Sequence, residues 1–408
     1  MPHALASHVA PPRMSTARVV LLLSLMMGLQ PVATDLYLPA LPAISRTLGA
    51  SAGTAQLTLT AMLLAFGLSQ LLWGPLSDRL GRRPMLLLGL ALFTLAGVYG
   101  AWVNTMQQLI VARCLQGIGM GAVVVCGRAL IRDLYDHEEG ARIMSQGLTG
   151  LGLVACLSPP LGGLIAQYLG WHVTLLTLAV FAALTLVLVA TRFNETLAAP
   201  NPHALALGPM ARSCWHILRH RHFQVYAMLS TATYGGLFTF LVASPFVFIQ
   251  VYGLSPAEFG LAMLFQSVSY TGGTFLCRRL LKRLGVHRTL KVGGVLSLAS
   301  GVALMAFSLL HWHTVTTVLA CYFGFIVAHG IHQPCAQSGA VAPFAQAAGT
   351  ASALAGCLMM VVAFINGWWL GAHLDGNERA LTFGIGFWSV VLAVLAWGPV
   401  QRLGRATP

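Results

Sequence analysis

Charged residues are scarce in this sequence: they account for 8% of its 408 residues, whereas 57% are hydrophobic. A soluble domain carries about a quarter charged residues, so this deficit argues against a water-soluble fold. Acidic residues are scarcer still, at 10 Asp and Glu against 23 Lys and Arg, and the formal net charge is +13. The basic residues form no patch interleaved with aromatic residues, and we therefore expect no nucleic-acid partner.

Several functional motifs are also missing. The sequence has no Walker-type phosphate loop, which argues against an ATP-driven pump. It has no nucleophile–base arrangement or metal motif that would indicate an enzyme, so a membrane enzyme or a channel is the least favoured class. The eight cysteines include no CxxC pair, and we expect no disulfide framework.

Long apolar stretches dominate what is present. Each is close to the roughly 20 residues that a helix needs to cross a bilayer core. We therefore predict an all-α membrane protein with twelve transmembrane helices. The first stretch has no convincing cleavage site and is interpreted as a retained helix, not a signal peptide. The predicted spans are 19–40, 54–76, 84–103, 107–129, 143–165, 172–191, 223–250, 257–277, 290–310, 314–336, 347–371 and 380–400.

The chain divides near its middle. The longest connection, 192–222, is interpreted as a cytoplasmic central linker between an N-terminal bundle, 1–191, and a C-terminal bundle, 223–408. The connection "GPLSDRLGRRP" of the first half has a counterpart, "CRRLLKRLGVHR", in the second. Two pseudo-symmetric six-helix bundles are typical of secondary transporters, whose substrate site lies between them near the membrane midplane.

The basic residues predict the orientation. If both termini are cytoplasmic, only Arg46 and Arg379 lie outside and only Arg113 lies deep within a span, whereas every other Lys and Arg lies at the cytoplasmic end of a span or in a cytoplasmic connection. This is the distribution that the positive-inside rule requires. The excess of positive charge is therefore a topology signal, with some attraction to anionic lipid headgroups.

The connection after the second predicted span carries a family signature. "GPLSDRLGRRPML" resembles the cytoplasmic loop of the major facilitator superfamily. The resemblance implies that fold and a conformational latch that stabilises the outward-open state. We expect Gly74 to let helices approach and Asp78 to cap and pair. A plain basic loop that sets topology is the alternative. The residues that carry the resemblance are Gly74, Asp78, Arg79, Gly81, Arg82 and Arg83.

Two further segments narrow the resemblance. "ATDLYLPALPAI" and "RCLQGIGMG" are similar to the Bcr/CflA-type (bicyclomycin/chloramphenicol resistance) drug:proton antiporters. This resemblance implies proton-coupled efflux of small, partly apolar compounds across the bacterial inner membrane, by a monomer with no cofactor other than the proton gradient. The alternative is a facilitator-fold transporter of a metabolite such as an amino acid or sugar derivative.

The antiporter motif of the fifth span is incomplete. "SPPLGG" keeps Pro159, Gly162 and Gly163 but has Ser158 where the family usually has glycine. Met27 stands where some multidrug relatives carry a second acid. Recognition of cationic drugs by two acids is therefore not expected.

Asp35 is the only one of the ten acidic residues that lies away from the ends of a predicted span, since Glu258 stands at the start of its span. Because a charge in the membrane costs at least about 2.5–3.5 kcal/mol, such a residue is a functional hypothesis with a partner to be named. Counting along the helices places Asp35 and Arg113 about 6 and 9 Å below the outer edge of the bilayer core. We predict that the two residues couple transport to protons. A structural ion pair, or an acid that only faces water, are the alternatives.

Other polar and aromatic residues are candidates for the substrate cavity, with packing or interhelical hydrogen bonds as the alternative. They are Gln30, Tyr37, Gln116, Phe238 and Asn366. In "HGIHQPC", His329, His332 and Cys335 share one helix face and could relay protons or hold a metal, but polar packing beside the proline is favoured and no metal site is predicted. "SPAE" at 255–258 predicts a capping box.

Cysteine labelling tests the topology. Single cysteines introduced by Ala50→Cys and Asn377→Cys should react with an impermeant thiol reagent added outside intact cells, because both positions lie in predicted external connections. If either is protected from the reagent, the assignment is wrong.

Overall fold

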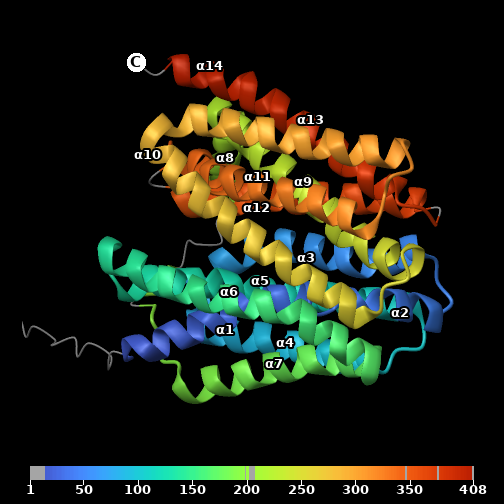
Figure 1. Cartoon of the computed structure of the whole chain (residues 1–408). Helices are drawn as coiled ribbons and strands as arrows, with labels where there is room; N and C mark the ends of the chain where they lie inside the picture. Colours follow the sequence, from blue (N-terminus) through green and yellow to red (C-terminus); the bar gives the residue numbers. More distant parts are fainter. Residues whose placement is uncertain (1–13, 198, 202–206, 345–346, 375, 407–408) are drawn as a thin grey trace, which may run out of the picture.

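Long helices run side by side through the molecule (Figure 1). The computed structural model describes residues 14–197, 199–201, 207–344, 347–374 and 376–406, and within these residues it has no strand. Eleven helical stretches there are long and apolar enough to span a membrane. One of them, α10 (Pro256–Leu309), is two helices joined at Gly285, whose φ of 70° is not helical. The prediction of twelve membrane-spanning helices is therefore confirmed.

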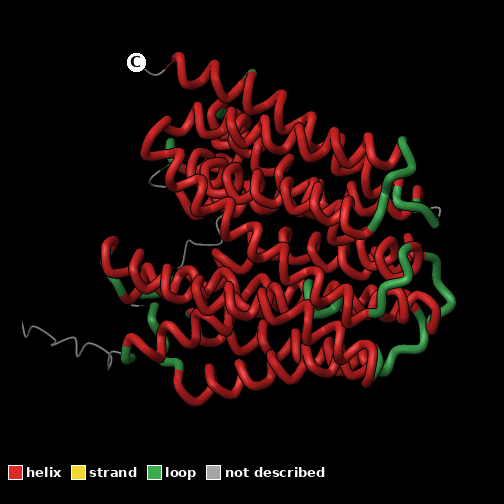
Figure 2. The backbone as a smooth tube through the Cα atoms, in the orientation of Figure 1, coloured by secondary structure: helices red, strands yellow, loops and turns green. Residues whose placement is uncertain are grey.

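The helices form two groups, which Figure 1 shows one above the other, with the ends of the helices joined by short loops (Figure 2). The first group contains α1 (Thr16–Thr34), η1 (Leu38–Ala40), α2 (Leu41–Thr47), α3 (Ala52–Leu80), α4 (Arg82–Ala101), α5 (Met106–Leu134), α6 (His137–Tyr168) and α7 (Trp171–Arg192). The second contains α8 (Leu207–Arg219), α9 (Arg221–Phe246), η2 (Val247–Val251), α10, α11 (Val315–Val341), α12 (Ala348–His373), α13 (Arg379–Trp397) and α14 (Pro399–Ala406).

The predicted linker between the two groups, 192–222, is partly helical. It contains α8, whose sequence LGPMARSCWHILR alternates apolar and basic residues at helical spacing. Residues 198 and 202–206 of the predicted linker lie outside the described residues. Several helices also extend beyond the predicted spans, because polar ends that leave the apolar window remain helical; α6, for example, begins at His137.

The first span is broken near its end. α1 stops at Thr34, and η1 and α2 continue in nearly the same direction to Thr47, so that the three elements count as one span. Pro31, Pro39 and Pro42 explain the break, because each proline removes a backbone donor and opposes a regular helix. The predicted span over 19–40 is therefore present, and it is broken after Thr34. Further along the chain, the predicted capping box is confirmed, with Ser255 and Glu258 bonding each other's backbone N–H groups.

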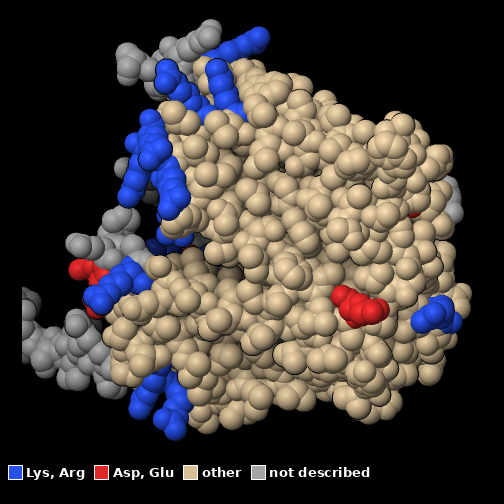
Figure 3. All heavy atoms as spheres, in the orientation of Figure 1, with Lys and Arg blue, Asp and Glu red and all other residues tan. Residues whose placement is uncertain are grey.

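Basic residues gather at one end of the molecule, which we call the basic end; it carries Arg18 at the start of α1, the α3–α4 connection and Arg192 at the end of α7. Figure 3 shows this edge lined by Lys and Arg, few charged side chains at the opposite, far end, and a surface between them with almost no charge. A band of this kind fits a lipid bilayer.

The two groups pack tightly at the far end. On α3 and α12, Gly53 lies against the backbone of Gly371, Gly367 against Thr60, and Gly67 against Met360. The glycines let the two helix backbones approach, as small residues do in membrane proteins.

The same two helices separate toward the basic end. A side chain placed on Gly74 of α3, or on Gly349 or Gly356 of α12, would meet nothing within 4 Å. Figure 3 shows a hollow in the surface between the groups at this end. The structure is therefore closed at the far end and open at the basic end.

Candidate functional site

Asp35 lies at the break in the first span. It caps the C-terminal end of α1, and its N–H donates to the carbonyl of Pro31 over 2.7 Å. Its carboxylate accepts a hydrogen bond from the Thr34 hydroxyl at 2.7 Å and is half-buried. The phenol of Tyr322, on α11 of the second group, lies within electrostatic range of it. Asp35 therefore belongs to the first group and faces the second.

Arg113 of α5 lies on the other side of the same break and is fully buried. Its Nη2 donates to the carbonyl of Ala33 at 2.6 Å, and its Nη1 donates to Oε1 of Gln116 at 2.7 Å. The guanidinium also stacks over the ring of Tyr37, 4.2 Å from its centroid. Because the break leaves carbonyls of α1 without helical partners, Arg113 satisfies one of them at the end of the helix dipole that favours a cation.

Asp35 and Arg113 do not form an ion pair in this structure. Within the described part of the chain, no carboxylate lies within 4.0 Å of the Arg113 guanidinium. Both residues nevertheless lie at the last turn of α1. The break in the helix is the physical reason for the difference, because it offers Arg113 a backbone carbonyl and turns the acid toward the second group. The alternative of a permanent structural ion pair therefore fails in this conformation.

The motif of the fifth predicted span packs against this break and against the second group. Gly162 of α6 lies against the carbonyl of Leu36, the residue after Asp35. Gly163 lies against the carbonyl of Pro256, and Gly260 of α10 lies against the carbonyl of Pro159. The motif thus joins the site of the acid to the closed far end.

The signature loop between α3 and α4 is fastened within the first group. Arg82 is buried and pairs with Asp78 at 2.6 Å and with Asp133 of α5 at 2.9 Å. The same guanidinium donates to the hydroxyl of Ser77 at 2.6 Å. Arg132 of α5 reaches Asp78 at 3.8 Å. The pairing predicted for Asp78 is therefore present, and all of these partners belong to the first group.

Glu195 is an anchor for the loop that sequence reasoning missed. Its carboxylate accepts hydrogen bonds from the N–H groups of Arg82, Arg83, Thr196 and Leu197 at 2.9 to 3.0 Å. Partial burial raises the pKa of Glu195, but these four donors outweigh it and hold the pKa below the usual value. The anchor is therefore complete above the ordinary pKa of glutamate, and it is lost as the pH falls through the lowered pKa.

The other members of the signature have distinct places. Gly81 connects α3 to α4 with a φ of 99°, where a side chain would be strained and would also meet Glu195. Arg83 donates to the carbonyl of Ala190 on α7 at 2.9 Å, and Arg79 is exposed. The expectation that Gly74 allows a close helix approach is wrong for this conformation, because the two groups are apart at the basic end.

Three of the five cavity candidates lie inside packed bundles. Tyr37 is fully buried, with its hydroxyl 2.7 Å from that of Thr58, and Gln116 is held by Arg113. Asn366 of α12 donates to the hydroxyl of Thr239 at 2.8 Å and accepts from the indole of Trp388 at 3.2 Å. Tyr37 and Asn366 thus bond residues of other helices, whereas Gln116 bonds a residue of its own helix, α5.

The remaining candidates lie along the inner helices. Gln30 is half-buried on α1, one turn before the break, and its carbonyl accepts from Thr34. Phe238 of α9 is 4% exposed and packs on Tyr234. His329 and His332 do not converge: His329 lies 2.9 Å from the hydroxyl of Thr233, whereas His332 packs against Gly293.

Sequence reasoning assigned no role to Arg128. This residue of α5 is exposed, yet its guanidinium lies within electrostatic range of the phenol of Tyr234 on α9. Among the described residues, no carboxylate lies within 4.0 Å of it. On the opposite group, Gln333 donates to the Tyr234 hydroxyl at 3.4 Å and accepts from that of Tyr270 at 2.9 Å. The sequence feature that could have pointed to Arg128 is its place inside the apolar run VVVCGRALI. We had interpreted this arginine as marking the cytoplasmic end of the span.

This arrangement defines a membrane transporter of two helical groups, not an enzyme. The chain belongs to the major facilitator superfamily, because the family model described as Major Facilitator Superfamily matches residues 23–367.

Curated relatives and solved structures agree with this assignment. A bicyclomycin resistance protein homolog of Haemophilus influenzae is 28% identical over 383 residues, which cover 94% of this chain and 96% of the relative. A chloramphenicol resistance protein of Pseudomonas aeruginosa is 31% identical over 352 residues, 85% of this chain and 82% of the relative. The crystal structure of a D-xylose–proton symporter superposes with a TM-score of 0.74 at 18% identity, covering 94% of this chain and 98% of that one.

Gly74 provides a test of the opening at the basic end. Gly74→Leu should fold normally, because its side chain meets nothing here, but it should block closure of the basic end and abolish transport. Gly67→Leu is the matched control: its side chain overlaps Met360 and should lower the free energy of unfolding by about 1–3 kcal/mol. Thermal unfolding and efflux of both variants provide the comparison. Full transport by Gly74→Leu would contradict this description.

Proposed function

We propose that this transporter exports small, partly apolar compounds in exchange for protons, by alternating access between its two helical groups. The names of its relatives support the class of cargo, since they include bicyclomycin, chloramphenicol and multidrug resistance proteins. The groups that move would be 1–191 and 223–408, joined by the 192–222 linker. The working unit would be a monomer driven by the proton gradient.

The orientation is part of the proposal. We place the basic end in the cytoplasm, with both termini there, because cytoplasmic loops of membrane proteins carry the excess of Lys and Arg. The membrane would be the bacterial inner membrane. The conformation described here is then inward-open, and cargo would enter the hollow from the cytoplasm.

The proposal of proton coupling rests on one observation. Asp35 is an acid in a membrane span, and Arg113 does not pair with it. Arg113 donates instead to the Ala33 carbonyl and to Gln116. The carboxylate accepts a hydrogen bond from the Thr34 hydroxyl and faces α11 across the boundary between the groups. A carboxylate so placed can bind a proton when the site opens to one side and release it when the site opens to the other.

The signature loop between α3 and α4 would act as a latch in the same alternating-access cycle. In this conformation the partners of Asp78 and Arg82 belong to the first group. Closing the basic end would bring Gly74 and the loop against α12. We propose that the loop then makes contacts to the second group that stabilise the outward-open state.

The alternative function, transport of a metabolite such as an amino acid or sugar derivative, has one observation in its favour. Arg128, Tyr234, Gln333 and Tyr270 present hydrogen-bonding groups from both helical groups. A polar metabolite would use such groups fully, whereas a partly apolar compound would use only some of them. Uptake and efflux assays with chloramphenicol, bicyclomycin and amino acids in cells that lack their main efflux pumps distinguish the two functions.

Asp35→Asn tests the coupling. The variant mimics the protonated acid permanently, so it should fold and still exchange cargo, but it should not convert a proton gradient into accumulation. Energised efflux should therefore vanish while counterflow survives. Glu258→Gln is the control, because Glu258 is an acid at the far end that bonds the N-cap of its own helix.

Arg113→Ala separates structural from coupling roles. It should leave the Ala33 carbonyl unpaired in the bundle and lower stability by about 1–3 kcal/mol, which would appear as lower expression and a lower Tm. Asp35→Asn should not share this loss. If Asp35→Asn retains full uphill efflux, Asp35 has no part in the coupling.

A further inference from the structure

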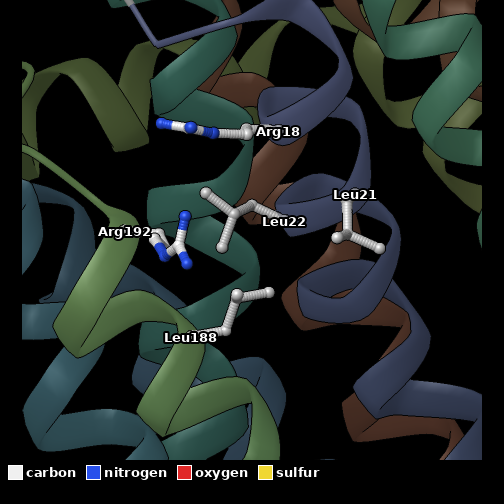
Figure 4. Close-up of a pocket in the computed structure, with 5 residues that line it drawn as sticks. All are labelled: Arg18, Leu21, Leu22, Leu188 and Arg192. Carbon is white, nitrogen blue, oxygen red and sulfur yellow. The ribbon is translucent and has the colours of Figure 1, made fainter.

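A small pocket opens between α1 and α7 at the basic end (Figure 4). Its volume is about 150 Å³. It is remote from the break that carries Asp35, since it lies at the opposite end of α1. It is lined by Arg18, Leu21, Leu22, Leu188 and Arg192.

Two arginines from different helices lie at the mouth of this pocket. Figure 4 shows the side chains of Arg18 and Arg192 extending into the space beside Leu22. Both side chains are exposed, and among the described residues no carboxylate lies within 4.0 Å of either guanidinium. The guanidinium group of arginine suits the oxygen atoms of a phosphate group, and two such groups lining one pocket favour an anionic occupant.

The backbone adds to this positive charge. Arg18 lies in the first turn of α1, where the dipole of the helix is itself positive. The residue before the helix, Ser15, does not cap it with its side chain. A cation in this position is unfavourable unless an anion is nearby, so the local charge favours a negatively charged occupant.

The chain's own N-terminus does not supply that anion. Residues 1–13 read MPHALASHVAPPR and contain no acidic residue. No acidic side chain of this segment can therefore be the occupant.

The rest of the pocket is apolar and open to the outer surface of the bundle. Leu21 is 51% exposed, and on the same face of α7 Leu184 and Val187 are 66% and 59% exposed. Exposed leucine and valine on a membrane span face acyl chains, so an occupant can place its charge on the arginines and its apolar part along these side chains.

We propose that this pocket binds one anionic phospholipid, with its phosphate between Arg18 and Arg192 and an acyl chain along Leu21 and Leu188. A basic pocket between membrane helices is the arrangement that recognises acidic lipid headgroups. The site rests on the membrane-spanning fold and not on the proton coupling or the cargo, so failure of the Asp35 experiment leaves it unaffected.

Lipid titration of the purified full-length protein tests the site. Native mass spectrometry with dioleoyl phosphatidylglycerol as probe should show one lipid bound more tightly than dioleoyl phosphatidylethanolamine. The double variant Arg18→Gln/Arg192→Gln should weaken phosphatidylglycerol binding roughly 25-fold, about fivefold per arginine. Its Tm should stay close to that of the natural chain, because neither arginine has a carboxylate partner among the described residues.

A matched control removes two charges elsewhere at the basic end. Arg288→Gln/Lys291→Gln, on the second half of α10, should leave phosphatidylglycerol binding within twofold. An equal loss in both double variants, or no loss in either, overturns the proposal.

Two further experiments distinguish a lipid headgroup from a free phosphate compound as the ligand of the arginines. Glycerol phosphate at millimolar concentration should not displace the lipid, whereas displacement would show that the arginines bind a free phosphate and would overturn the lipid assignment. Leu21→Asn keeps both arginines but makes the surface that would contact the acyl chain polar. It should weaken phosphatidylglycerol binding severalfold. Unchanged binding would likewise contradict a lipid occupant.

Discussion

The hydrogen bond from Arg113 to the carbonyl of Ala33 is the contact on which the candidate site depends. Three prolines end α1 inside the membrane, and a backbone carbonyl freed there must find a partner because lipid offers none. Arg113 supplies it from α5, with Tyr37 covering the guanidinium and Gln116 holding its other arm. Because the arginine is committed to the backbone, Asp35 remains free of it and faces the second helical group.

Small residues link this site to the closed far end. Gly162 admits the carbonyl of Leu36, while Gly163 and Gly260 bring α6 and α10 together through their backbones. The corresponding contacts between α3 and α12 stop at Gly67. Contacts of this kind depend on shape and close approach, so a change around Leu36 acts directly on the packing between the two groups. This gives a short physical connection between the protonation of Asp35 and the opening of the far end, through the backbone of its neighbour.

Much of the fold could be predicted from the sequence. Hydrophobic length specified the spans, and the signature loop specified the superfamily, because both depend on local patterns. What the sequence could not show depends on packing between distant segments. No pattern shows that Arg113 bonds a carbonyl, that Tyr37 and Asn366 lie inside bundles, or that Arg128 faces Tyr234. The break in α1 could have been foreseen from Pro31, Pro39 and Pro42, had they been weighed against the apolar run around them.

The central claim is that Asp35, freed from Arg113, is the proton carrier. Substrate-driven proton release from the purified protein in weakly buffered detergent solution tests this claim most directly, because it needs neither a gradient nor a full transport cycle. The account predicts that adding a transported compound releases protons from the natural chain and that Asp35→Asn abolishes this release while still binding the compound. Proton release of the same size from Asp35→Asn would contradict it.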